Sequence, residues 1–276
     1  MKYQTFNRSC AYAGLANMLL DYSIDVEDRD IVLKAYIPFM FGHDKAENKY
    51  MAGPMLQGKK WFDLYLNGIG FEFLDKYYDI EGAIKFLSST KERAMIGLKK
   101  DDTGRHAVVF IGMRDGGYFF LNNKHKETKE KEELVFRKDE LYDVIDDDSV
   151  IGYISAIESK RNVDYYAEMM AALDTLERYR EDVVSFISAK RTIDEIMSAK
   201  RSLFEALMLD VVSMLDIIGE KELLNKIIDL RGKYSDALQQ RTELVLKECI
   251  PVNDVNSVID MYKNIIKKKM AQVASI

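Results

Sequence analysis

Apolar residues recur every three or four positions through the second half of the chain, from about Arg161 onward. This spacing puts apolar side chains on one face of a helix. Gly219 is placed to end one helix, and Pro251 interrupts the pattern again. The sequence therefore predicts four long helices joined by short turns, which favours an antiparallel bundle. The apolar stripes comprise Tyr165, Met169, Leu173, Leu176 and Tyr179; Ile193, Ile196, Leu203, Leu207, Val211 and Leu215; and Leu223, Ile227, Leu230, Tyr234 and Leu238.

The first half of the chain has a different pattern, in which short helical stretches come before β-branched apolar runs. Asp115, Gly116 and Gly117 stand between two such runs and predict a hairpin turn. We therefore expect an α+β domain, with a helical front half and an antiparallel sheet, over residues 1–158, and an all-helical domain over residues 159–276. The predicted helices are 11–22, 26–35, 56–66 and 80–87, and the predicted strands are 71–74, 94–98, 106–113, 118–121, 134–136 and 150–157.

Residues 38–54 show neither the helical spacing of apolar residues nor the pattern of a strand, and they carry prolines at both ends. The sequence predicts an irregular loop there. A loop of this length inside a compact domain is more often functional than not, so His43 within it is a candidate for lining a substrate groove.

Composition and charge narrow the classes of function. The chain has 276 residues, 47% of them hydrophobic, and a net charge of −6, which argues against nucleic acid or an anionic membrane as the main partner. No apolar run reaches the roughly 20 residues that a membrane-spanning helix needs, and the first nine residues lack the apolar core of a signal peptide. We expect a cytoplasmic protein without membrane insertion, in which Cys10 and Cys249 stay reduced.

Cofactor sites are not indicated. The three histidines and two cysteines have no spacing typical of a metal site, and no Gly-rich loop leads from a strand into a helix to hold a phosphate. We expect no metal and no cofactor.

Cys10 stands at the start of the first predicted helix, with Ser9 placed to act as its N-cap. The positive end of a helix dipole favours a thiolate, which is the nucleophilic form of cysteine. Gln4 lies one short loop upstream, where its side-chain amide can donate to an oxyanion formed at the attacked carbonyl. This arrangement suits covalent catalysis, although an isolated cysteine is more often a small buried apolar residue. A nucleophile at residue 10 also predicts no N-terminal inhibitory propeptide.

The chain has three histidines that could serve as the base for this thiol. His106 opens a buried strand after a polar loop, and Asn122 closes the strand paired with it through the hairpin turn. Neighbouring antiparallel strands bring such residues within side-chain reach, so Asn122 can accept an imidazole N–H and fix the tautomer. The alternative is that His106 is a core histidine and Asn122 a turn residue, without a catalytic role for either. His43 and His125, the second of which lies in the charged loop 124–133, are both weaker candidates than His106.

The order and spacing of Gln4, Cys10, His106 and Asn122 resemble the papain-like cysteine peptidases, above all the double-glycine leader peptidases of bacteriocin export. The resemblance covers about residues 1–157. It implies a papain-like thiol hydrolase fold in which Cys10 is the nucleophile, His106 the general base and acid, and Asn122 the orienting residue. Gln4 and the Cys10 backbone N–H would form the oxyanion hole. Two features depart from that pattern: Ser9-Cys10-Ala11 replaces the usual Asp-Cys-Gly, and Asn122 replaces the usual Asp.

The helical C-terminal region and residues 38–54 have no counterpart in that group. They are more similar to the butirosin-biosynthesis acyltransferase family, which moves an acyl group from a carrier-protein thioester to an amine. Three hypotheses follow: a peptidase or amidase acting on a peptide, an acyltransferase that uses an acyl thioester and a carrier protein, or a peptide-binding module without catalysis. The helical region is in each case a candidate surface for a homodimer or another partner.

Overall fold

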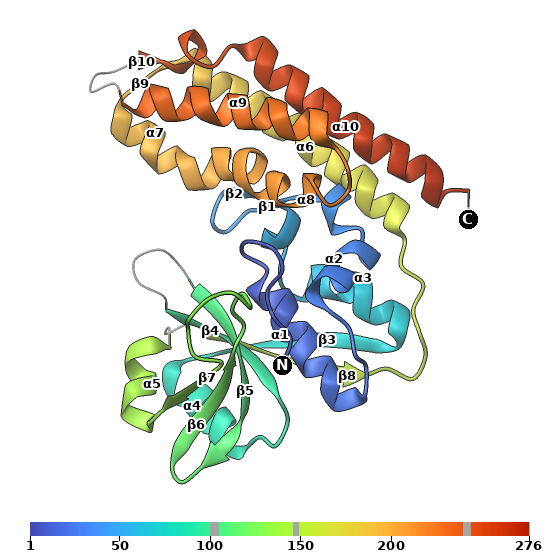
Figure 1. The fold of residues 1–276 in the computed structure, drawn as a ribbon, viewed down its shortest axis with the longest axis vertical. Coiled ribbons are helices and arrows are strands. Elements are labelled where there is room, and N and C mark those ends of the chain that lie inside the picture. The colour runs from blue at the N-terminus through green and yellow to red at the C-terminus, as the bar shows by residue number, and fades with distance from the viewer. Residues whose placement is uncertain (100–104, 146–148, 240–243, 276) are drawn as a thin grey trace. The chain divides into compact units, whose positions relative to one another are not determined.

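The computed structural model describes residues 1–99, 105–145, 149–239 and 244–275, with Leu244 described by its backbone alone (Figure 1). The chain forms two compact units. The first, here called the α+β unit, comprises Met1–Ala35 and Gln57–Val163, and the second, the helical unit, comprises Tyr36–Leu56 and Asp164–Ile276.

The α+β unit is built on a six-stranded sheet in which every hydrogen-bonded pair of strands is antiparallel. The strands of the sheet, in spatial order, are β3 (Phe71–Tyr78), β8 (Ser149–Ala156), β4 (Ala94–Lys99), β5 (Arg105–Arg114), β6 (Gly117–Asn122) and β7 (Glu133–Phe136). Asp115 and Gly116 join β5 to β6 with φ values of 50° and 75°, so the predicted hairpin turn is confirmed.

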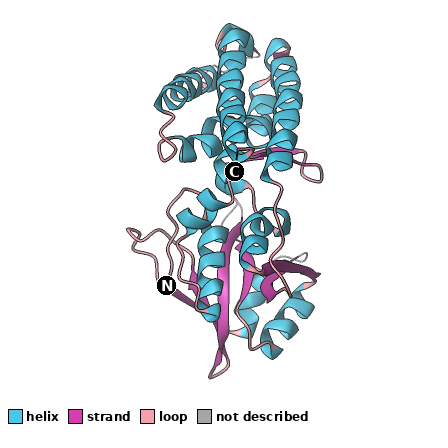
Figure 2. Ribbon diagram, turned by 90° about the vertical axis from the view of Figure 1, so that its right-hand side faces the viewer, coloured by secondary structure: helices cyan, strands magenta, loops and turns pink. Residues whose placement is uncertain are grey.

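Helices cover both faces of this sheet (Figure 2). α1 (Cys10–Leu19) lies across one face, where Gly14 makes the close approach possible: a Cβ on this residue would lie 3.1 Å from Met95 and 3.3 Å from Val109. α4 (Ile80–Ser89) and α5 (Lys138–Val144) bury their apolar sides against the other face, in a core that includes Leu98, Val108 and Phe110. α2 (Asp28–Lys34) and α3 (Lys59–Ile69) complete the unit.

The helical unit contains long helices that run side by side, with consecutive segments pointing in opposite directions (Figure 1). α7 (Ile193–Ala199) continues through the π-helical segments Lys200–Phe204 and Ala206–Val211 into α8 (Val212–Leu215). The other helices are α6 (Tyr165–Ser188), α9 (Lys221–Leu238) and α10 (Val252–Val273), and the two-residue strands β9 (Lys190–Arg191) and β10 (Leu244–Val245) pair with each other. The predicted α+β class and the helical C-terminal region are confirmed.

The prediction of an irregular loop at residues 38–54 is wrong. β1 (Phe41–Asp44) and β2 (Lys49–Ala52) form a hairpin between two short 3-10 turns, Ile37–Phe39 and Gly53–Met55. The rings of Phe41 and Tyr50 pack against Tyr179 at centroid distances of 5.3 and 5.0 Å. This packing attaches the hairpin to the helical unit, so the compact units are not the contiguous segments 1–158 and 159–276 that the sequence suggested.

Among the described residues, every helix is too short or too polar to cross a bilayer.

Candidate active site

Cys10 is half-buried. Because it is the first residue of α1, its side chain lies at the positive end of the helix dipole, as expected. Ser9 occupies the predicted N-cap position, but its side chain makes no capping hydrogen bond to the helix. Its hydroxyl donates to Asp28 Oδ2 at 2.7 Å and accepts from the backbone N–H of Phe6 at 3.1 Å. The bond to the buried carboxylate orients the hydroxyl, and its oxygen accepts from Phe6 instead of from a backbone N–H of the helix.

Asp28 fixes the loop between Gln4 and Cys10. Its side chain is fully buried at the start of α2 and accepts from Ser9 Oγ, from Thr5 Oγ1 and, at 2.7 Å, from the backbone N–H of Thr5. A buried carboxylate is stabilised only when such donors surround it. Sequence reasoning missed Asp28, because an acidic residue in the first turn of a helix is common and carries no signal of a distant loop.

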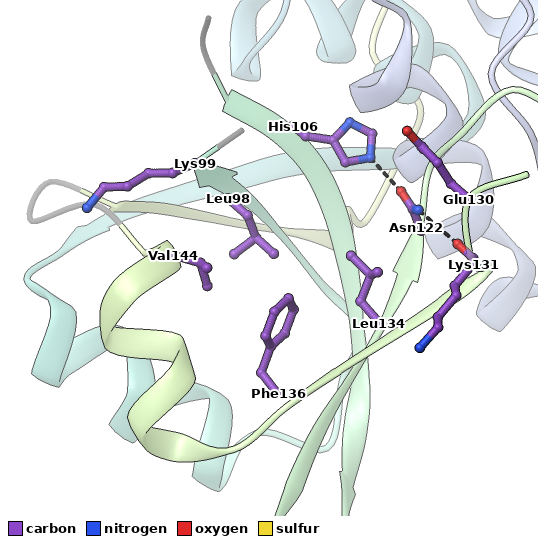
Figure 3. Close-up of a pocket in the computed structure, with 9 residues that line it drawn as sticks. All are labelled: Leu98, Lys99, His106, Asn122, Glu130, Lys131, Leu134, Phe136 and Val144. Carbon is purple, nitrogen blue, oxygen red and sulfur yellow. Dashed lines mark hydrogen bonds between the residues drawn. The ribbon is translucent and has the colours of Figure 1, made fainter. Parts of the chain in front are cut away.

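His106 and Asn122 meet as predicted. His106 Nε2 and Asn122 Oδ1 lie 2.7 Å apart, and Asn122 Nδ2 donates to the backbone carbonyl of Lys131 at 2.8 Å (Figure 3). Because the Lys131 carbonyl can only accept, the amide nitrogen of Asn122 must face it, and the amide oxygen must face the imidazole. That oxygen can also only accept, so Nε2 carries the proton. In the neutral ring, the lone pair is then on Nδ1.

Gln4 is held mainly by its backbone. Its N–H donates to the carbonyl of Lys124 at 2.9 Å, and Gln4 forms an isolated β-bridge with His125. The side-chain Nε2 donates to the carbonyl of Phe6 at 2.8 Å, which uses one of its two N–H groups. His125 therefore has a backbone role at this site, and the oxyanion role of Gln4 stays a prediction.

His43 belongs to the helical unit. Its Nε2 lies 3.2 Å from Asn48 Oδ1, and its ring packs on Tyr50 at a centroid distance of 4.5 Å. Both partners come from the same hairpin, so the contacts of His43 explain the residue as part of that hairpin.

Cys10 lines a pocket of about 190 Å³ on the α1 face of the sheet. Phe62, Phe73 and Met95 give it an apolar lining, and Gly152 lies directly under the ring of Phe73, where a Cβ would clash with that ring. Arg105 and Ala107, the two chain neighbours of His106, line the same pocket. The thiol is thus brought to the beginning of β5.

His106 lines a second pocket, of about 340 Å³. Leu98 lies directly opposite His106 on β4, and Gly97 lies opposite Ala107, so this pocket is on the face of the sheet that α5 covers. Cys10 and His106 therefore line separate pockets on the two faces of the sheet, and both pockets lie at the beginning of β5. The remaining apolar residues that line the second pocket are Leu134, Phe136 and Val144 (Figure 3).

A buried pair of asparagines holds α1 against β5 and β6. Asn123 Nδ2 donates to the carbonyl of Ala107 at 2.9 Å, and Asn123 Oδ1 accepts from Asn17 Nδ2 at 3.1 Å. Both side chains are fully buried, and the amides satisfy each other there. This pair positions the helix that carries Cys10 beside the strand that carries His106. Sequence reasoning missed it, since the two residues are 106 positions apart.

Metal ligands do not gather anywhere in the part of the chain that the structure describes: no three His, Cys, Asp or Glu side chains are placed to hold an ion.

No family model matches this chain, and no curated protein does. Its structural neighbours include double-glycine peptidase domains. One is the peptidase domain of Streptococcus ComA, a bifunctional ABC transporter involved in quorum sensing (11% identity, TM-score 0.42, covering 56% of this chain and 96% of that one). Another is a double-glycine-motif protease of an AMS/PCAT transporter, in complex with the leader peptide (13% identity, TM-score 0.39, covering 56% of this chain and 89% of that one). A third is a C39-like peptidase from Bacillus anthracis (14% identity, TM-score 0.36, covering 55% of this chain and 91% of that one). With TM-scores of 0.36 to 0.42, these similarities assign no activity to this chain.

Proposed function

We propose that the α+β unit catalyses acyl transfer through a thioester on Cys10, as a peptidase or amidase acting on a peptide. The observation that carries this proposal is the fixed hydrogen bond from His106 Nε2 to Asn122 Oδ1. It sets the tautomer in which Nδ1 accepts a proton, the state that a cysteine nucleophile requires of its base. The position of Cys10 at the head of α1 adds a dipole that favours the thiolate.

The proposed reaction has two halves. His106 Nδ1 takes the thiol proton, the sulfur attacks the substrate carbonyl, and the backbone N–H of Cys10 and the amide of Gln4 donate to the resulting oxyanion. The imidazolium then gives its proton to the leaving amine, and the C–N bond breaks. Water attacks the thioester, again losing a proton to His106, and the acid is released from Cys10.

Cys249 provides an internal control for the labelling experiment, because both cysteines are half-buried thiols outside any disulfide. We expect iodoacetamide at pH 6.5 to modify Cys10 before Cys249, as read by peptide mass spectrometry. His106→Ala should slow modification of Cys10 about tenfold or more, since the paired base is lost. Preferential modification of Cys249, or an unchanged rate in His106→Ala, would contradict the assignment.

Turnover needs a separate test. A peptide library prepared from digested cell protein, incubated with the full chain, should show new cleavage products by mass spectrometry. Cys10→Ala should abolish them, and Cys249→Ala should leave them unchanged. A labelled Cys10 without turnover on peptides or acyl esters would instead favour a binding module.

A further inference from the structure

We propose that the His106 pocket binds an apolar side chain on the leaving-group side of the scissile bond, and that Leu134 and Phe136 set this specificity. The inference depends on the proposed function, because it needs Cys10 to hold the acyl group and His106 to serve the leaving amine.

The chemistry assigns the two halves of the substrate to different pockets. After the first step, the acyl half is bonded to the sulfur of Cys10 and occupies the pocket that this residue lines. The other half departs as an amine, which takes its proton from the imidazole and therefore lies next to His106 at that moment. The group attached to this amine is then adjacent to the second pocket, which His106 itself lines.

The second pocket suits an apolar side chain. Leu98 is only 4% exposed, and Leu134, Phe136 and Val144 are partly buried around it. Figure 3 shows these four side chains together below His106, while the ammonium ends of Lys99 and Lys131 point away from them. The amide of Asn122 is already satisfied by His106 and Lys131, so it does not call for a polar ligand. A volume of about 340 Å³ admits a leucine or phenylalanine side chain.

The same pocket should receive an amine that attacks the thioester. In this step the amine nitrogen bonds to the acyl carbon, the C–S bond breaks, and the proton of the amine passes through His106 to the leaving sulfur. This is the reverse of the first step, so the incoming amine occupies the place of the departing one. Its side chain is therefore selected by Leu134 and Phe136.

The experiment uses p-nitrophenyl acetate as the acyl donor. This ester can acetylate Cys10, so the natural peptide substrate need not be known. Leucinamide and glycinamide, two amines of similar basicity, are added at equal concentration, and the N-acetylated products are quantified by mass spectrometry. We expect wild-type protein to acetylate leucinamide about tenfold more than glycinamide, since burial of a leucine side chain favours the first amine. Phe136→Ala and Leu134→Ala should each reduce this ratio to about twofold.

Val135→Ala is the matched control. Val135 lies between the two pocket residues on β7, but its side chain points to the other face and is 51% exposed. The ratio in this variant should equal that of wild type, and circular dichroism checks that each variant is folded. The wild-type measurement alone decides the matter if Phe136→Ala does not fold.

Equal transfer to both amines by wild-type protein would overturn the inference, as would the same loss of preference in Val135→Ala and Phe136→Ala. Failure of the proposed function gives a different result: Cys10 of the wild-type protein would then carry no acetyl group at all, compared with Cys10→Ala.

Discussion

The side-chain oxygen of Asn122 lies 2.7 Å from Nε2 of His106, and the nitrogen of the same amide donates to the Lys131 carbonyl at 2.8 Å. The backbone N–H of Asn122 also donates, to the carbonyl of Glu132 at 2.8 Å. Asn122 is only 4% exposed. The amide thus has one orientation that satisfies all of its partners, and a buried group held in this way keeps the imidazole in one tautomer.

Replacement of Asn122 separates orientation from charge. Asn122→Ala should lower turnover of p-nitrophenyl acetate by roughly 100-fold, because the ring is no longer held in its proton-accepting tautomer. Asn122→Asp keeps an oxygen that accepts from Nε2 and should retain more activity than Asn122→Ala, although the bond to the Lys131 carbonyl is lost. Steady-state kinetics across pH 5 to 9 would compare the three proteins. Equal activities in all three would mean that the pair is structural only.

Gln4 can be tested by two reactions of the same thiol. Attack on a carbonyl creates an oxyanion, whereas alkylation by iodoacetamide does not. Gln4→Ala should therefore reduce turnover on the order of 100- to 1,000-fold. The rate of Cys10 alkylation should stay within about twofold of wild type, because the dipole and the base that favour the thiolate are unchanged.

The fold of this variant is expected to survive, since the backbone of Gln4 supplies its bond to Lys124. Parallel losses in both reactions would indicate a disturbed site and would remove the oxyanion role from Gln4.

Sequence patterns predicted the parts of the site that depend on local structure. A β-branched run predicted the strand of His106, the Asp115-Gly116 turn fixed its partner strand, and the antiparallel register then brought Asn122 to the imidazole. Cys10 followed from the start of a helical period in the same way.

Contacts between distant segments were not predictable in this way. The hairpin of residues 41–52 has no alternating pattern that would mark it from sequence, and Phe41 is buried by Tyr179 from a helix far along the chain. The buried acceptor Asp28 and the pair Asn17–Asn123 likewise depend on partners that no local motif indicates. Gly14 did leave a signal, since a glycine inside a helical pattern often has a packing reason.

Gly14 allows α1 to approach the sheet, and this can be measured. A Cβ there would lie 2.7 Å from Asn123 Nδ2, in addition to its contacts with Met95 and Val109. Gly14→Ala should therefore lower the free energy of unfolding by about 1–3 kcal/mol, because the side chains around it are already packed. Gly232 lies on an exposed face of α9, where no atom of the described residues outside its own helix backbone comes within 4 Å of the Cβ position, so Gly232→Ala should raise that free energy by about 0.5–1 kcal/mol.

Urea denaturation followed by far-UV circular dichroism would compare the two variants with wild type. Both substitutions improve intrinsic helix propensity, so a decrease in the unfolding free energy for Gly14→Ala alone would come from its packing against the sheet. A stabilised Gly14→Ala would show that α1 can move away from β5 without cost.

Tyr234 makes the stability of the helical unit depend on alkaline pH. Burial raises the pKa of its phenol from 10.0 to about 12, and Glu205 adds a smaller contribution. The hydroxyl donates to the carbonyl of Ile196 at 3.2 Å, which only the protonated form can do. Since the pKa in the folded state is raised, this contribution is fully present below pH 10 and is lost as the pH rises through about 12.

Wild-type protein should therefore lose about 1.4 kcal/mol more of its unfolding free energy than Tyr234→Phe between pH 8 and pH 11. The variant keeps the packed ring, which contacts Phe204 at a centroid distance of 4.7 Å, but has no proton to lose. Urea unfolding at the two pH values, followed by helical ellipticity, gives the four free energies that are needed. The loss of unfolding free energy between the two pH values is compared between wild type and Tyr234→Phe. The other buried tyrosines titrate in both proteins, so their contribution cancels in this comparison. A value near zero would show that the phenol of Tyr234 reaches solvent in the folded state.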